Sequence, residues 1–287
     1  MGKASFWKTD WFLGLAISLV VLAVGGSDLL QSLERKAYDI GVNATARTPS
    51  DRVAVIAIDK RSIDNIGRWP WSREVLAETI DRLAAAKAKV IATTVFYSEP
   101  QRDPGLAYID QLQDLYGQIA VNPPSAATGA PAAAAGAAPE PASPLVRMGA
   151  LLGEAEKKLN TDRRLAESVA NAGNVVLPLL FRLERPRGRP DQALPEYLRK
   201  NGLHPAPGEV EGAIQSSDID ASVIAPLGTA AAAIGHLNTT PDVDGGIRSE
   251  PLVVAHFDLL FPSLSLMIAA KSLNLGVNDI QVKPGNS

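Results

Sequence analysis

Residues 52–100 decide the fold and read RVAVIAIDKRSIDNIGRWPWSREVLAETIDRLAAAKAKVIATTVFYSEP. The apolar, β-branched run at 52–58 predicts a buried strand that ends at Asp59. A helical pattern of apolar residues follows over 73–88, and the run at 90–96 predicts a second strand. A strand, a helix and a strand in this order form a βαβ unit. We therefore expect parallel pairing of the two strands with a right-handed crossover.

The rest of the sheet and its covering helices are predicted from the same patterns further along the chain. Apolar runs predict strands at 174–181, 236–238 and 247–256, and a further one beginning at 279–282. Helical periodicity predicts helices at 104–116, 145–172 with a break near Asn160, 226–234 and 262–275. The predicted fold class is α/β, with a mixed, mainly parallel sheet flanked by helices and preceded by one N-terminal transmembrane helix.

The N-terminal segment Trp11–Gly26 reads WFLGLAISLVVLAVGG, sixteen residues without a charge. Apolar residues continue to Leu30, so the segment approaches the ~20 residues that a spanning helix needs. Lys3 and Lys8 precede it, and positive residues before a first span favour a cytoplasmic N-terminus. The alternative interpretation is a cleaved signal peptide. Both interpretations place the rest of the chain outside the cytoplasm.

This segment sets the predicted domain organisation. We expect a cytoplasmic N-terminus at 1–10, a transmembrane helix at 11–30, a helical stalk at 31–50 and a periplasmic domain at 51–287. Within that domain, residues 123–144 contain 18 Ala, Pro and Gly residues among 22. Side chains this small cannot fill a core, so we expect a mobile, low-complexity insertion.

Composition and motifs exclude several functional classes. The chain has 28 Lys and Arg against 31 Asp and Glu, a formal net charge of −3, which lacks the basic surplus of a nucleic-acid binder. It contains no cysteine, hence no disulfide and no thiolate site. The sequence contains no nucleotide-binding glycine motif and no hydrolase motif, and His204, His236 and His256 are not at metal-ligand spacing. We expect no catalytic residue, no metal site, no cofactor and no nucleic-acid partner.

Polar and aromatic residues gather where the predicted strands end, and parallel sheets bind ligands at that edge. The candidate ligand-binding residues are Asp59, Trp69, Trp71, Arg73, Ser98, Glu99, Asn238 and Arg248. Aromatic rings, carboxylates and arginines together suit a small polar molecule. The alternative gives the same residues structural roles. Asp59 and Ser62 would cap a short helix. Arg73 would pair with Glu99, and the two tryptophans would cover the sheet edge.

Several of these stretches resemble the type-two CHASE domain, an extracellular sensory module of bacterial membrane receptors. The matching pieces are AIDKRSI at 57–63, GRWPWSR at 67–73, SEP at 98–100, GNVVLPLLF at 173–181, GHLNTTPDVDGGIRSEPLVV at 235–254 and FPSLSLMIA at 261–269. The chain departs from the family pattern at 93–95, where TTV replaces the common FDV and removes an aspartate.

The resemblance implies an α/β sensor in the periplasm, anchored in the bacterial inner membrane. In that family a serine/threonine kinase, a nucleotide cyclase such as adenylate cyclase, or a histidine kinase follows the sensor. We expect a homodimer, membrane lipid contacts through the anchor, and a small-molecule or envelope signal. Two alternatives remain open: a membrane-anchored periplasmic enzyme that uses Asp59 and Glu99, and a dimerisation module that needs no ligand.

Overall fold

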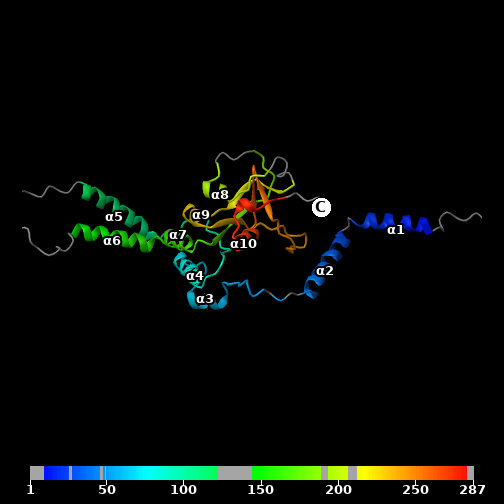
Figure 1. Cartoon of the computed structure of the whole chain (residues 1–287), viewed down its shortest axis with the longest axis horizontal. Coiled ribbons are helices and arrows are strands. Elements are labelled where there is room, and N and C mark those ends of the chain that lie inside the picture. Colours follow the sequence, from blue (N-terminus) through cyan, green and yellow to red (C-terminus); the bar gives the residue numbers. More distant parts are fainter. Residues whose placement is uncertain are drawn as a thin grey trace, which may run out of the picture. The chain divides into compact units, whose positions relative to one another are not determined.

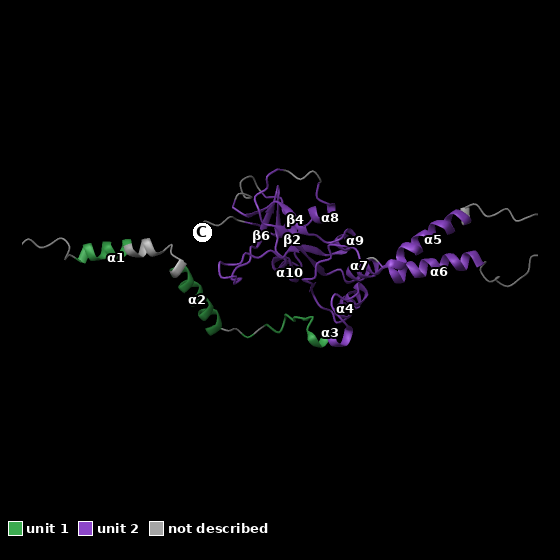
Figure 2. Cartoon of the chain, turned by 180° about the vertical axis from the view of Figure 1, so that it is seen from behind, with its two compact units in different colours: residues 1–63 green, residues 64–287 purple. Residues whose placement is uncertain are grey.

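The chain folds as two compact units, residues 1–63 and 64–287 (Figure 2). The computed structural model describes residues 10–25, 28–45, 48, 50–101, 103–121, 144–188, 193–205 and 212–282. Apart from Pro144, the predicted insertion at 123–144 lies outside the described residues.

The first unit is helical. It contains α1 (Asp10–Gly25) and α2 (Asp28–Ala44), and α3 (Lys60–Ile66) begins in it (Figure 1). The helix predicted for the stalk is present as α2, which ends at Ala44, before the predicted limit at residue 50. In the part of the chain that the structure describes, no helix is both long enough and apolar enough to cross a membrane, so the spanning helix predicted over 11–30 is not found.

The strand predicted at 52–58 is wrong. These residues form no ladder with any described strand, and every side chain from 51 to 60 is exposed. Val53 is 72% exposed and Val55 is 88% exposed. A β-branched run becomes a strand only when a neighbouring strand supplies hydrogen bonds and a packing surface. The predicted βαβ unit therefore lacks its first strand.

The second unit contains the remaining helices, which are α4 (Arg73–Ala85), α5 (Pro104–Val121), α6 (Pro144–Leu159), α7 (Thr161–Ala172), α8 (Glu196–Arg199), α9 (Ala225–Ala230), α10 (Leu264–Ser272) and the 3-10 helix η2 (Val277–Asp279). The break predicted near Asn160 is confirmed, because the Asn160 side chain accepts a hydrogen bond from the Arg163 amide at 3.0 Å and caps α7.

Two small mixed sheets form the centre of this unit, from β1 (Ile91–Ala92), β2 (Val175–Arg182), β3 (Ile214–Ser216), β4 (Asp218–Ala221), β5 (Ala233–His236), β6 (Val253–His256) and β7 (Leu259–Pro262). In the first sheet, β2 pairs parallel with β1 and β5 and antiparallel with β4. In the second sheet, β6 pairs parallel with β3 and antiparallel with β7.

The prediction of one mainly parallel sheet is therefore corrected. A short turn at Phe257 and Asp258 connects β6 to β7, and strands joined so tightly must run antiparallel. The strand predicted at 90–96 is reduced to the two residues of β1. The strand expected to begin at 279–282 is absent, because η2 ends at Asp279 and residues 280–282 are irregular.

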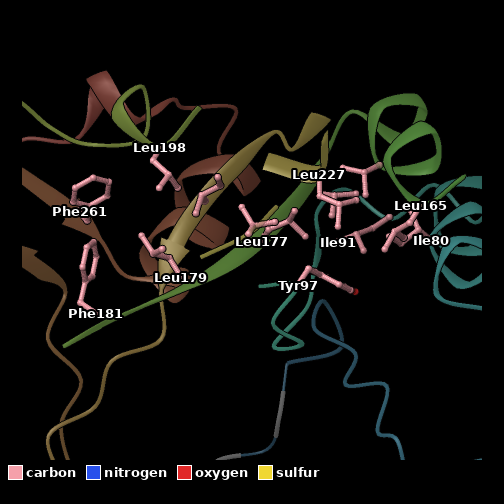
Figure 3. Close-up of a cluster of buried hydrophobic side chains, with 14 of the residues drawn as sticks. Ile80, Ile91, Tyr97, Leu165, Leu177, Leu179, Phe181, Leu198, Leu227 and Phe261 are labelled. Carbon is pink, nitrogen blue, oxygen red and sulfur yellow. The ribbon is translucent and has the colours of Figure 1, made fainter. Parts of the chain in front are cut away.

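The main core lies along β2, whose first five residues are buried (Figure 3). Helices cover both faces of a strand of this kind, so its sequence is continuously apolar rather than alternating. The rings of Phe181 and Phe261 lie 5.0 Å apart between their centroids and join the two sheets. Gly235 of β5 lies so close to α10 that an added Cβ would stand 2.7 Å from the Leu264 Cα.

Candidate functional site

Arg73 is one of two candidate residues that are buried, and the other is Asn238. Arg73 begins α4, and only 9% of its surface is exposed. Its guanidinium forms an ion pair with the carboxylate of Asp162 and donates a hydrogen bond to the main-chain oxygen of Glu99. The guanidinium carbon also lies 5.4 Å from the centroid of the Tyr97 ring, within cation–π range. The charge is therefore balanced by an anion, a carbonyl and a ring.

Gln101 completes this arrangement, which we call the arginine cluster: Arg73, Tyr97, Gln101 and Asp162. The Gln101 side-chain oxygen accepts from the Arg73 amide at 2.8 Å, and the Gln101 amide donates to Asp162 Oδ2 at 3.0 Å. The cluster thereby ties the start of α4 to the first turn of α7 and to the segment that follows β1. Burial raises the pKa of Tyr97, while a hydrogen bond with Thr93 and the charge of Arg73 oppose that rise.

The GRWPWSR loop leads directly into α4. The rings of Trp69 and Trp71 meet edge to face, with centroids 5.5 Å apart and planes at 77°. The Trp71 indole N–H donates to the Gly67 oxygen at 2.7 Å, and Gly67 has a φ of 119°, which favours glycine. Both tryptophans are half-buried, and the peptide bond before Pro70 is cis. The loop is therefore held by its own contacts.

Ser98 and Glu99 lie beside the arginine cluster with exposed side chains. The contact between Arg73 and Glu99 exists, but it uses the main-chain oxygen of Glu99. The expected carboxylate partner is instead Asp162, which lies 89 residues from Arg73 in sequence. The pairing of Arg73 with the Glu99 side chain is corrected accordingly.

Asp59 belongs to the first unit. Its carboxylate accepts from the Ser62 hydroxyl at 2.6 Å and from the Ser62 amide at 2.8 Å, and these two bonds lower its pKa. Asp59 therefore caps α3, as the structural alternative predicts.

Asn238 has a purely internal set of partners. Its side-chain oxygen accepts from the Phe181 amide at 2.9 Å, and its side-chain nitrogen donates to the Phe181 oxygen at 2.6 Å. It is buried and directly follows the parallel pairing of β5 with β2. The amide side chain thus extends that pairing by one step, in place of a further strand residue.

Arg248 closes the turn between β5 and β6. Its guanidinium lies 2.7 Å from Asp242 Oδ2 and 2.9 Å from Asp244 Oδ1. The Asp242 amide also donates to the Gly246 oxygen at 2.8 Å. The arginine therefore forms ion pairs with two carboxylates of its own loop.

Two buried histidines lie near the Phe181 ring. His236 is fully buried, its Nδ1 accepts from the Asn238 amide at 3.3 Å, and burial lowers its pKa to about 4. Its Nε2 has no hydrogen-bond partner within the described residues. His256 lies 3.0 Å from the Ser216 hydroxyl, and burial lowers its pKa against the opposing charge of Asp218.

Of the predicted residues, the structure brings together Arg73 and Glu99 beside the GRWPWSR loop, while Asn238 and Arg248 have separate internal partners.

Sequence reasoning missed Tyr97, Gln101 and Asp162. The signal for Asp162 was its place after the predicted helix break, since acidic residues favour the first turn of a helix. None of the candidates lines the cavity of about 270 Å³ formed by Leu203, His204, Pro205, Leu260, Ile280, Gln281 and Val282. The described residues contain no cluster able to hold a metal ion.

The second unit is an α/β domain with two mixed sheets, and in the sequence it follows a helical N-terminal region. The CHASE2 domain family matches residues 14–285, nearly the whole chain, and the chain belongs to that family. CHASE2 domains are extracellular sensory domains of signalling receptors, so the resemblance in the sequence is confirmed. Searches of curated proteins and of solved structures gave no match.

Proposed function

We propose that the chain is the extracytoplasmic sensor region of a bacterial transmembrane receptor that controls a serine/threonine kinase or an adenylate cyclase. The observation that carries this proposal is the CHASE2 match over 14–285. The sensor acts without catalysing a reaction, and its signal is a small molecule or a change in the cell envelope.

We further propose that residues 11–30 anchor the chain in the inner membrane, with residues 1–10 in the cytoplasm and the sensor in the periplasm. The support is the apolar surface of α1, on which large side chains are strongly exposed: Trp11, Leu13, Leu15, Ile17 and Leu19. Such a surface is unfavourable in water and favourable in lipid. Lys3 and Lys8 precede it on the proposed cytoplasmic side.

For the signal-binding surface, we propose the neighbourhood of the GRWPWSR loop. Exposed Ser98 and Glu99 supply a hydroxyl and a carboxylate there, and Trp69 and Trp71 supply half-buried rings. Arg73 links this surface to α7 through Asp162. A ligand that competes for the arginine would therefore loosen the contact of α4 with α7, which gives binding a structural consequence.

Insertions in the stalk of the full-length receptor test the proposal. One residue inserted after Gln31 rotates the rest of α2 by ~100°, whereas seven residues nearly restore the helical phase. We expect the single insertion to disrupt output activity and the seven-residue insertion to restore most of it. Output that is indifferent to both insertions would contradict signalling through this helix.

A further inference from the structure

Helices α5 and α6 form an antiparallel hairpin that projects from the N-terminal end of α7 (Figures 1 and 2). The Gln113 side chain donates to the Leu152 oxygen at 3.3 Å. A Cβ added to Gly149 would lie 2.6 Å from the Tyr116 hydroxyl, so the helices approach closely. The contact faces therefore contain Gln113 and Tyr116 on α5, and Gly149 and Leu152 on α6.

Helix α5 also carries a row of apolar side chains that are exposed and lie away from its contact with α6. Its members are exposed to the extent of 68, 40, 51 and 37%, in the order Tyr108, Leu112, Leu115 and Ile119. The spacing of four, three and four residues is the heptad pattern of helices that pack against another helix. The row thus has the geometry of an unused helix-packing seam.

Helix α6 adds Met148, 42% exposed, and Leu151, 66% exposed. At 100° per residue, both are rotated by about 100° from the α6 contact face, and the α5 row is rotated by about 100° in the same sense from its own. In antiparallel helices, rotation in the same sense leads to the same side of the pair. The six residues therefore share one side, which we call the hairpin face: Tyr108, Leu112, Leu115, Ile119, Met148 and Leu151.

We propose that the hairpin face is the interface of a homodimer, in which it packs against the hairpin face of a second copy to form a four-helix arrangement. A two-fold axis brings identical surfaces together, and an apolar face with helical ridges is complementary to itself under that symmetry. This inference rests on the hairpin alone and does not depend on the receptor function proposed above.

The loop of the chain itself is a poor occupant for this face. Residues 122–143 connect the ends of α5 and α6, and their sequence contains no aromatic residue and no Val, Leu, Ile or Met. Burial of such a segment would remove little apolar surface from water. This segment of 22 residues therefore lacks the apolar side chains that would be needed to cover the face.

A membrane surface fits the hairpin less well than a second copy does. Helices that lie on membranes carry Lys and Arg on the polar face. Helix α5 contains no Lys or Arg, and it carries Asp110 and Asp114, which lie on the side opposite to the row. Helix α6 contains Arg147, Lys157 and Lys158 against Glu154 and Glu156, so the hairpin has a formal net charge of −1 and lacks a basic surplus. Anionic lipid would repel α5, whereas the same face of another copy brings no such charge.

The size of the face predicts a weak dimer. Helices of 18 and 16 residues are ~27 and ~24 Å long, and two adjacent helices are ~20 Å wide, so the face offers roughly 500 Å² per copy. A standard specific interface buries ~800 Å² per partner. We therefore expect an association that is concentration-dependent.

Sedimentation of the full chain in detergent, up to about 100 µM, tests the proposal in the range where weak dimers form. We expect the wild-type mass to rise from one 30.3 kDa chain to two. Leu112→Lys with Leu115→Lys should remain at one chain. The control, Asp110→Lys with Asp114→Lys, adds two lysines at exposed positions on the side opposite to the row and should still dimerise. A wild type that stays monomeric, or a row variant that dimerises like the control, would overturn the proposal.

The absence of cysteine from the chain allows a second, independent measurement. Leu112→Cys should give a covalent dimer with a short bismaleimide, and Asp114→Cys on the opposite side should give little. Equal or stronger cross-linking through Asp114→Cys would place the contact elsewhere and refute the assignment. Unchanged circular dichroism and thermal midpoint in each variant show that the fold is retained.

Discussion

Arg73 and Asp162 form a buried ion pair between the first residue of α4 and the first turn of α7. Their side chains are only 10 and 12% exposed. Both charges have additional hydrogen-bond partners, because Arg73 also contacts the Glu99 oxygen and Asp162 also accepts from the Gln101 amide. The pair therefore holds together elements that are far apart in the sequence.

Removal of one partner of this pair should destabilise the fold strongly. Asp162→Asn leaves the buried guanidinium without an anion, a change that costs about 3–5 kcal/mol in comparable buried pairs. Urea unfolding of the wild type and the variant measures the difference. The exposed pair of Arg82 with Glu78 provides the control, and Glu78→Gln should cost less than about 1 kcal/mol. Equal effects at the two sites would show that the Arg73 charge is solvated.

The buried His236 should make stability depend on pH. Its folded pKa of about 4 lies below the unfolded value of 6.5, so the folded protein favours the neutral ring. The resulting stability is complete above pH 6.5 and is lost as the pH falls through about 4. The shift corresponds to about 3 kcal/mol. The stability difference between wild type and His236→Phe, measured by urea unfolding from pH 7 to 4, should shift in favour of the variant. A stability difference that stays constant with pH would contradict the lowered pKa of buried His236.

Asn238→Leu should destabilise the contact of β5 with β2. The variant leaves the Phe181 amide and oxygen unpaired at a buried position, which costs about 2–4 kcal/mol for two groups. Denaturant midpoints measure the loss. Asn278→Leu at an exposed position should change stability by about 0.5 kcal/mol or less. An unchanged midpoint for Asn238→Leu would mean that water replaces the side chain.

Substitutions of Trp71 distinguish a packing role of the GRWPWSR loop from a role in ligand contact. Because the side chain is half-buried, Trp71→Ala should cost about 2–3 kcal/mol, somewhat less than a fully buried aromatic residue. Trp71→Phe, which retains a ring and loses the bond to Gly67, should cost about 1 kcal/mol. Thermal or urea unfolding checks both values. If Trp71→Ala unfolds at the wild-type midpoint, the ring contributes no packing, and a role in ligand contact gains support.

Local patterns predicted the helices well. The helix at 73–88, the break at Asn160 and the strand at 174–181 are all present with small changes in their ends. Each is encoded by neighbouring residues, through apolar periodicity or a capping side chain. The run at 52–58 failed because β-branched residues form a strand only with a partner, and pairing is not a local property.

The candidate site shows the same division. Asp59 and Ser62 are three residues apart, and their capping contact was predictable. The partner of Arg73 was not, because Asp162 lies 89 residues away and exposed Glu99 was the nearer acid in the sequence. Likewise, Asn238 and Arg248 lie close to the ends of strands, where ligands bind, but Phe181 and two aspartates occupy their polar groups.

The side of the membrane on which the chain lies tests the central claim most directly. We propose to fuse alkaline phosphatase, which is active only in the periplasm, after Ser287, and to compare it with a fluorescent protein that matures only in the cytoplasm. An extracytoplasmic sensor predicts phosphatase activity without fluorescence, and deletion of 11–30 should reverse the result. Fluorescence without phosphatase activity in the intact chain would contradict the account.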